Sequence, residues 1–137
     1  MIKDELKLLI DIATQAQNYS HAPYSKYNVG AALLTKSGKI YTGCNIENAS
    51  FGATLCAERV AFAKAISDGE KDFVAICVVG GKNFSVWGYA YPCGICRQFM
   101  AEFCDSEFEI ALCDGEDVKL LTLGELLPMA FGADDIK

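Results

Sequence analysis

Three cysteines at the starts of two predicted helices constrain the fold of this chain more than any other feature. Cys56 lies two residues before Glu58, where an apolar helical pattern begins, and Cys93 and Cys96 open a second helical pattern. Their sulfurs could hold one zinc ion and leave its fourth position to water, beside the carboxylate of Glu58. Structural zinc sites use four protein ligands, whereas catalytic sites keep one position open. If the two helix starts converge, the pattern predicts an enzyme.

Other interpretations of the paired cysteines are weaker. A Cys-x-x-Cys pair can form a redox site or contribute half of a structural zinc site. The redox interpretation leaves Cys56 and Glu58 without a task. A structural site needs a fourth ligand, yet no second cysteine pair or histidine pair accompanies Cys56, and the single histidine, His21, lies in a predicted loop. We therefore favour an open, catalytic site.

Charged side chains beside the predicted ligands suit the chemistry of a bound water. Zinc can lower the pKa of water to about 7, and Glu58 could then take the proton and return it to a leaving group. Three thiolates make the metal centre negative, and Arg59 and Arg97 could offset that charge by hydrogen bonding to the sulfurs. The alternatives are an exposed first-turn glutamate favoured by the helix dipole and two surface arginines.

Apolar periodicity and turn residues predict alternating helices and strands. Expected helices cover residues 3–19, 56–67 and 93–104, and expected strands cover residues 29–35, 40–46, 73–79, 109–113 and 118–121. Gly38 suits the turn of a hairpin, Gly80-Gly81 is expected to end the third strand, and Thr122 is expected to cap a last helix. Helices between strands predict a single layered α/β domain over residues 1–137, with a mixed sheet covered on its faces.

Composition argues against several classes of protein. No apolar run approaches the ~20 residues of a membrane helix, and the N-terminal segment lacks the apolar core of a secretion signal. The net charge is −6 without any basic run, which disfavours a nucleic-acid substrate. Seven cysteines, an odd number, predict reduced thiols, with Cys44, Cys77, Cys104 and Cys113 as packing residues. We therefore expect a cytoplasmic protein that acts on a small molecule and binds neither membranes nor nucleic acid.

Two polar residues at the end of the second expected strand suggest a binding site. Asn45 and Glu47 lie two residues apart, so on a strand their side chains point to the same face. An amide and a carboxylate on one face could bind the hydroxyl groups of a sugar. The alternative is an ordinary polar strand end, and the local pattern does not decide between the two.

Several segments resemble the cytidine deaminase family, specifically its small homotetrameric enzymes. Cys56-Ala-Glu58, followed by Pro92-Cys93-x-x-Cys96, matches the signature of zinc deaminases, with cysteine in place of the more familiar first histidine. Residues 22–33, 43–49 and 126–131 are also similar to that family. The resemblance covers nearly the whole chain.

The resemblance implies a three-layer α/β/α fold with a mixed central sheet. It also implies hydrolytic deamination of cytidine and deoxycytidine to uridine and deoxyuridine, with release of ammonia, in pyrimidine salvage. One zinc ion in each subunit would be held by Cys56, Cys93 and Cys96. Glu58 would move protons as water adds to C4 of cytosine.

Further residues gain a role from the same resemblance. Asn45 and Glu47 match residues that hold ribose hydroxyl groups, which decides between the two interpretations above. Tyr27 replaces a phenylalanine that often packs near the base, and Ala57, between Cys56 and Glu58 in the motif, is expected to contact the substrate. Phe131 matches an aromatic residue that completes a neighbouring subunit's site, so a homotetramer with shared active sites is expected.

Two other functions are compatible with the same motifs. A different nucleoside deaminase of the same superfamily, such as a blasticidin-type enzyme, would share the zinc site, although Asn45, Glu47 and the segment 24–27 favour cytidine. A non-catalytic, zinc-stabilised binding module would leave Glu58 without a task.

Overall fold

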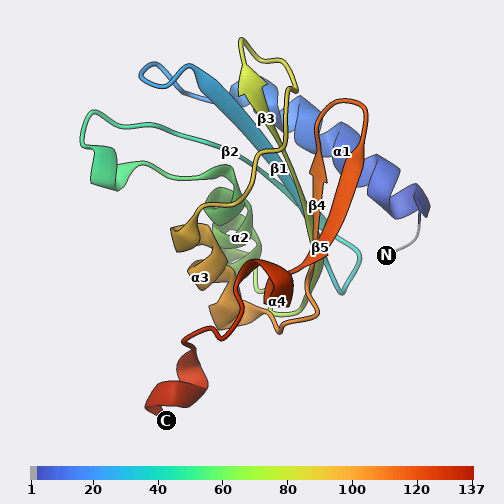
Figure 1. Cartoon of the computed structure of the whole chain (residues 1–137), viewed down its shortest axis with the longest axis vertical. Coiled ribbons are helices and arrows are strands. Elements are labelled where there is room, and N and C mark those ends of the chain that lie inside the picture. Colours follow the sequence, from blue (N-terminus) through green and yellow to red (C-terminus); the bar gives the residue numbers. More distant parts are fainter. Residues whose placement is uncertain (1–2) are drawn as a thin grey trace.

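One mixed sheet of five strands forms the centre of the molecule, and helices cover both of its faces (Figure 1). The computed structural model describes residues 3–137, so Met1 and Ile2 of the N-terminal segment lie outside it. The strand order is β2-β1-β3-β4-β5; β3 and β4 are parallel, and the other neighbouring pairs are antiparallel. The strands are β1 (Tyr27–Thr35), β2 (Ile40–Cys44), β3 (Phe73–Lys82), β4 (Glu109–Cys113) and β5 (Val118–Thr122). The helices are α1 (Lys3–Ala16), α2 (Ala57–Ser67), α3 (Gly94–Phe103) and α4 (Leu123–Leu126), with 3₁₀ turns η1 (Gln17–Tyr19), η2 (Phe51–Ala53) and η3 (Ala133–Ile136).

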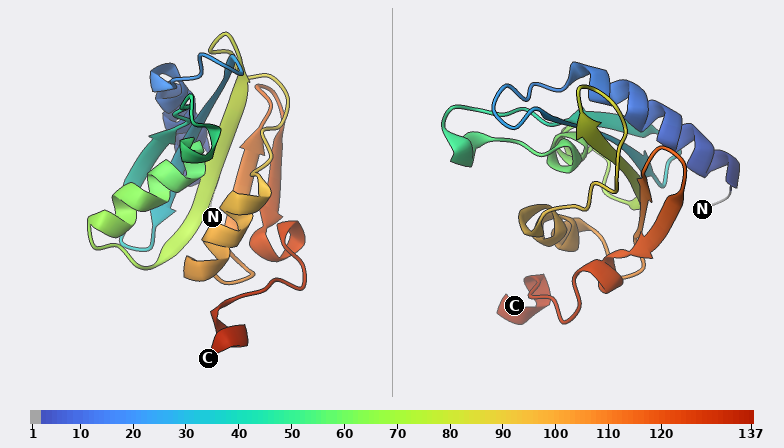
Figure 2. Two further views of the ribbon diagram at one scale, coloured as in Figure 1. Left: turned by 90° about the vertical axis from the view of Figure 1, so that its left-hand side faces the viewer. Right: turned by 45° about the horizontal axis from the view of Figure 1, so that its top comes forward.

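The two faces of the sheet carry separate apolar cores because side chains alternate along each strand. On β3, Ile76 and Val78 belong to the core shared with α2 and α3, whereas Cys77 and Val79 belong to the core under α1. Figure 2 shows α1 on one side of the sheet and α2 and α3 on the other. This confirms the three-layer α/β/α arrangement. Within residues 3–137, no helix has the length and apolar character needed to cross a membrane.

β3 is longer than expected, because Gly80 and Gly81 continue the strand and pair with β1 instead of ending it. A Cβ atom at Gly81 would lie 2.2 Å from the Ser85 carbonyl oxygen. At Gly80 it would lie 2.8 Å from the Tyr27 hydroxyl group. Both glycines are therefore explained by close packing and do not end the strand.

β2 is shorter than expected and ends at Cys44. Ile46 forms isolated bridges with two other loop segments instead of extending the pairing with β1. Asn45 and Glu47 consequently lie just beyond the sheet, on the segment that leads toward α2. Their placement at one site therefore depends on these loop contacts and not on a shared strand face.

β2 and α2 approach each other very closely at Gly43. A Cβ atom there would lie 2.1 Å from the Ala57 carbonyl oxygen and 2.8 Å from the Ala61 nitrogen. The missing side chain lets the first turn of α2 rest directly on the sheet. Gly43 thus determines how close the start of α2, which follows the predicted metal ligand Cys56, lies to the sheet.

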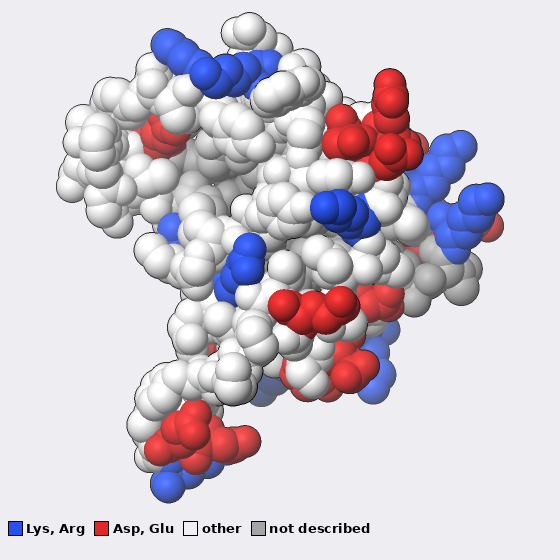
Figure 3. All heavy atoms as spheres, in the orientation of Figure 1, with Lys and Arg blue, Asp and Glu red and all other residues white. Residues whose placement is uncertain are grey.

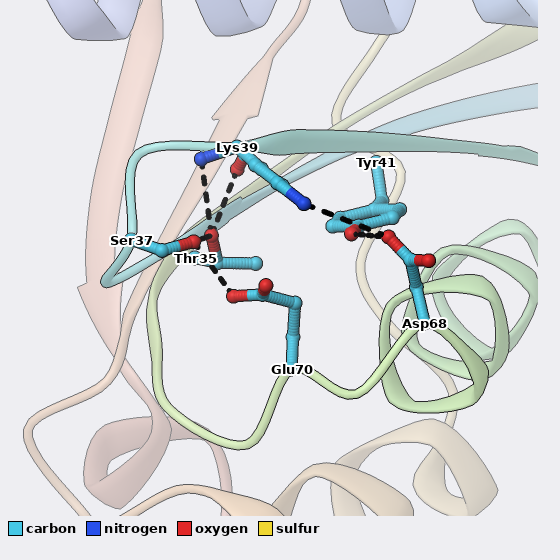
Figure 4. Close-up of polar contacts among 6 residues, drawn as sticks. All are labelled: Thr35, Ser37, Lys39, Tyr41, Asp68 and Glu70. Carbon is cyan, nitrogen blue, oxygen red and sulfur yellow. Dashed lines mark hydrogen bonds and ion pairs between the residues drawn. The ribbon is translucent and has the colours of Figure 1, made fainter.

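Polar side chains tie the β1–β2 hairpin to the other end of α2 (Figure 4). The Tyr41 hydroxyl group donates to the Asp68 carboxylate, which raises the pKa of Tyr41 to about 12. Lys39 Nζ lies 3.9 Å from an Asp68 oxygen, and the Ser37 hydroxyl group donates to Glu70 over 2.7 Å. The hairpin therefore contacts both ends of α2, which restricts how the helix can shift along the sheet.

Candidate metal and substrate site

The starts of α2 and α3 converge on one face of the sheet. Cys56 and Cys93 are the N-cap residues of these helices, and Cys96 lies in the first turn of α3. The three Sγ atoms all lie within 4.8 Å of one another, and those of Cys56 and Cys93 are 3.7 Å apart. A tetrahedral zinc ion with Zn–S bonds of about 2.3 Å places its sulfur ligands about 3.8 Å apart. The three thiols therefore fit one zinc ion.

The surroundings of Cys56 favour its thiolate form. The contact with the Cys96 thiol and a hydrogen bond from Arg59 lower the pKa of Cys56 to about 5, although burial acts in the opposite direction. Nη2 of Arg59 lies 3.6 Å from Cys56 Sγ. The positive end of the α2 dipole adds stabilisation of the same sign. The same contact between the two thiols raises the pKa of Cys96, so the pair shares one proton, which must leave when a metal binds both thiolates. The hydrogen bond from Arg59 is thus the contact that favours metal binding.

Arg97 has a different set of partners from Arg59. Its Nε donates to the Pro92 carbonyl oxygen over 2.8 Å, and its Nη1 donates to the Leu126 carbonyl oxygen over 2.8 Å. These bonds direct the guanidinium group toward α4 and away from a direct hydrogen bond to a ligand sulfur. Arg97 instead holds Pro92, the residue before Cys93, in place through this hydrogen bond to its carbonyl oxygen.

Replacing Arg59 with Gln should weaken zinc binding by about 10- to 100-fold, the usual effect of removing a partner of a metal ligand. Glutamine has no charge to stabilise the Cys56 thiolate. Competition with a chromophoric zinc chelator at neutral pH measures the affinity. Lys64→Gln, which removes a positive charge from the last turn of the same helix, is the matched control. Unchanged zinc affinity in Arg59→Gln would contradict the role of Arg59.

Glu58 lies in the first turn of α2 and is only 5% exposed. Burial raises the pKa of its carboxyl group to about 7, and the negative charge on Cys56 acts in the same direction. A carboxyl group with this pKa can accept and release a proton near neutral pH. The burial excludes the alternative of an ordinary exposed glutamate at a helix start.

A cavity of about 330 Å³ opens beside these residues. Its lining includes the expected residues Tyr27, Asn45, Glu47, Cys56, Ala57, Glu58 and Cys93. Ser25, from the segment 24–27, also lines it, as do residues to which the sequence gave no individual role, among them Val29, Val78, Ala90 and Tyr91. Of these, Tyr91 could have been found from its position two residues before Cys93, whereas the two valines look like any other core residues of a strand.

The Asn45 side chain is fixed at the cavity wall by three hydrogen bonds. Its Oδ1 accepts from the Ser20 hydroxyl group over 2.5 Å and from the Val29 N–H over 2.9 Å. Its Nδ2 donates to the Tyr27 carbonyl oxygen over 2.8 Å. The orientation of the amide is therefore determined by the protein itself.

Glu47 is fixed in a similar way by the loop before β1. One carboxylate oxygen accepts from the N–H groups of Tyr24 and Ser25, over 2.9 and 3.1 Å, and the other accepts from the Ser25 hydroxyl group. Burial acts to raise the pKa of Glu47, but the hydrogen bonds from Ser25 and Tyr24 prevail and lower it. Glu47 is thus an ionised acceptor at neutral pH. Ser25, from the segment 24–27 that favoured cytidine, holds it in place.

The two aromatic residues predicted from the resemblance lie in different places. The Tyr27 hydroxyl group lies close to Gly80 of β3, and burial, followed by the charge of Glu58, raises the pKa of Tyr27. Phe131 does not line this cavity; it is 60% exposed in the segment after α4, where its carbonyl oxygen accepts from Gln98 over 2.8 Å. The fold brings Tyr27, but not Phe131, to the site of its own chain.

Comparison with known proteins agrees with this geometry. Residues 3–112 match the family model described as the cytidine and deoxycytidylate deaminase zinc-binding region. A cytidine deaminase of Halalkalibacterium halodurans is 47% identical over 131 residues, covering 95% of this chain and 96% of that protein. The crystal structure of a cytidine deaminase from Burkholderia pseudomallei has a TM-score of 0.85 at 42% identity, covering 96% of this chain and 100% of that one.

A blasticidin-S deaminase of Bacillus cereus is also similar, but less so. It is 32% identical over 130 residues, covering 90% of this chain and 89% of that protein. The two cytidine deaminases above are 47% and 42% identical to this chain, against 32% for the blasticidin-S deaminase. On this basis the chain belongs to the cytidine deaminase family.

Proposed function

We propose that this protein is a zinc-dependent deaminase that hydrolyses cytidine and deoxycytidine to uridine and deoxyuridine and releases ammonia. The observation that carries the proposal is that three cysteine thiols cluster beside one cavity, which is lined by two of them, Cys56 and Cys93, and by the buried Glu58. Three protein ligands leave the fourth zinc position open, as in other catalytic zinc sites.

The chain's own residues divide the chemistry between them. Zinc held by Cys56, Cys93 and Cys96 would supply a Lewis acid that makes water acidic at neutral pH. Glu58 accepts the proton of the attacking water and delivers protons to the pyrimidine ring and to the departing amino group. Because Glu58 is shielded from solvent and its pKa lies near 7, it can hold a proton between these two transfers.

The unused hydrogen-bonding capacity of Asn45 and Glu47 matches a sugar hydroxyl group. Two donors already occupy Asn45 Oδ1, and one of the two Nδ2 protons is in use, so one N–H is left for a ligand. The Glu47 oxygen that accepts from the Ser25 hydroxyl group can still accept another hydrogen bond. A hydroxyl group accepts from Asn45 and donates to Glu47 at the same time.

The remaining lining suits the base of a nucleoside. Val29, Val78 and Ala90 give the cavity apolar walls, and its volume of about 330 Å³ lies within the range of small-molecule sites. On the face shown in Figure 3, Lys and Arg side chains are scattered among acidic ones instead of forming a stripe. With a net charge of −6, this distribution favours a small uncharged substrate over a polynucleotide.

We propose that the protein forms a homotetramer whose subunits share active sites. The chain after α4 projects from the body of the molecule (Figure 1), and Met129, Phe131 and Ile136 are exposed on it. Exposed apolar side chains on such a segment favour a protein contact. The family resemblance supports a role for Phe131 in a neighbour's site. Sedimentation at micromolar concentration tests this assembly, and a monomer would contradict it.

A cytoplasmic location agrees with the state of the cysteines. All seven are free thiols, and thiols persist in a reducing compartment. Fractionation of cells that produce the protein tests this location, which recovery from an oxidising compartment would contradict.

Conversion of cytidine to uridine, followed by ultraviolet absorbance, tests the proposed activity. Zinc content is measured on the same sample, and deoxycytidine, blasticidin S and adenosine serve as further substrates. We expect turnover of both cytosine nucleosides by the zinc-loaded protein. Zinc-loaded protein without any turnover would favour the binding module, and preferential turnover of blasticidin S would favour the other type of deaminase.

A further inference from the structure

A chain of hydrogen bonds, here called the relay, runs from Phe84 in the loop after β3 through Asn28 and Ser20 to Asn45. The Phe84 N–H donates to Asn28 Oδ1 over 3.0 Å, and Asn28 Nδ2 donates to Ser20 Oγ over 3.1 Å. The Ser20 hydroxyl group donates to Asn45 Oδ1 over 2.5 Å. Ser20 and Asn28 are not part of the cavity lining. They therefore reach the site through Asn45.

Backbone groups at both ends set the direction of every hydrogen bond in the relay. The Phe84 N–H can only donate, so Asn28 faces it with its oxygen and turns its amino group toward Ser20. At the other end, the Val29 N–H donates to Asn45 Oδ1 over 2.9 Å and identifies that atom as the acceptor. Ser20 accepts from Asn28 and is left to donate its single proton to Asn45.

Asn28 is the firmly held member of the relay. It is 5% exposed, and its backbone carbonyl oxygen accepts from Gln17 Nε2 over 3.0 Å. The same Gln17 atom donates to the Ser85 carbonyl oxygen over 2.7 Å. Phe84 has a φ angle of 57°, a conformation that a bulky residue keeps only when its surroundings enforce it, whereas the neighbouring Asn83 (56°) is of a type that adopts it more readily. These contacts make the outer end of the relay rigid.

We propose that Ser20 and Asn28 are positioning residues that orient the Asn45 amide toward the sugar of the substrate. This inference rests on the proposed deaminase function. With Oδ1 held by two donors and one Nδ2 proton on the Tyr27 carbonyl oxygen, the last N–H of Asn45 has a defined direction. Loss of the Ser20 hydroxyl group leaves Oδ1 short of one partner and lets the amide tilt. Sugar binding then weakens while the zinc site is untouched.

The test compares a nucleoside that carries the secondary sugar hydroxyl groups with one that lacks them. In Ser20→Ala, KM for cytidine should rise roughly 2- to 10-fold, the effect of one weakened hydrogen bond, with little change in kcat. The inhibition constant of 2′,3′-dideoxycytidine should stay at the wild-type value, because this analogue has no secondary hydroxyl group for Asn45 to bind. Equal weakening of both compounds would indicate a merely structural role and overturn the proposal.

Asn28→Asp tests the relay by a second route. The carboxylate still accepts the Phe84 N–H, but it cannot donate to Ser20, whose proton then turns to the carboxylate and away from Asn45. The same selective rise in KM for cytidine is expected. In the double variant Ser20→Ala/Asn28→Asp, KM for cytidine should be no higher than in the more affected single variant, because both changes act on one hydrogen bond. Additive losses would overturn the relay.

Ser85→Ala is the matched control. It removes a hydroxyl group that donates to the Lys82 carbonyl oxygen over 2.6 Å, outside the relay. Its KM for cytidine should equal that of the wild type, and thermal denaturation confirms that each variant is folded. Failure of the proposed function would appear as an inactive, zinc-loaded wild type. Failure of this inference would appear as an unselective change in KM of an active enzyme.

Discussion

Replacing Glu58 with Gln should lower kcat/KM for cytidine by about 10²- to 10⁴-fold, the usual contribution of a general acid–base group. Glutamine has nearly the same shape and can occupy the buried first turn of α2. It can neither accept nor release a proton near neutral pH. Because the three cysteines are unchanged, the variant should still bind zinc.

Steady-state ultraviolet assays and metal analysis on the same samples measure both parts of this result. Glu102→Gln, an exposed position on α3, is the matched control and should keep the wild-type rate. A Glu58→Gln protein that is zinc-loaded and has wild-type kcat/KM would contradict the acid–base role. A variant that has lost its zinc would instead indicate that Glu58 helps to maintain the metal site.

Gly43→Ala should destabilise the protein by about 1–3 kcal/mol or more, the range for groups forced into a packed interior. Its Cβ atom would lie 2.1 Å from the Ala57 carbonyl oxygen and 2.8 Å from the Ala61 nitrogen. Both are backbone atoms, so the overlap is relieved only if the first turn of α2 moves away from the sheet. That turn carries Glu58 and follows Cys56, so zinc affinity and activity should fall together with stability.

Urea unfolding, zinc content and deaminase activity should be measured side by side for this variant. Gly52→Ala is the matched control, because a Cβ atom at Gly52 would meet no heavy atom within 4 Å among the described residues, apart from its neighbours in the chain. It should match the wild type in all three measurements. Wild-type stability of Gly43→Ala would mean that the contact between β2 and α2 is looser than the structure indicates.

Elements whose signals act within a few residues were predicted correctly. Gly38 has a φ angle of 94° in the β1–β2 turn, as the hairpin pattern required. The Thr122 N–H donates to Glu125 over 3.0 Å, and the Glu125 N–H donates back to Thr122 over 3.3 Å, so the capping box is present. Such features depend on the backbone preferences of neighbouring residues, which the local sequence expresses directly.

Features that depend on contacts between distant segments were not predicted. Gly80 was expected to end β3, but the reason for this glycine is the close approach of Tyr27 from β1. Arg97 was expected to contact a sulfur, but the carbonyl oxygens that it contacts include one from α4, far along the chain. No local pattern encodes such partners, because they are chosen by how the layers pack.

The candidate site divides along the same line. The sequence by itself determined the thiols, the carboxylate beside them and their positions at two helix starts, because ligand spacing and helix periodicity are local. Only the tertiary structure decided that these helix starts meet, that Glu58 is buried, and that the relay through Ser20 and Asn28 holds Asn45. Each of these depends on residues brought together from separate segments by the packing of helices on the sheet, so distances and burial exist only once the chain has folded.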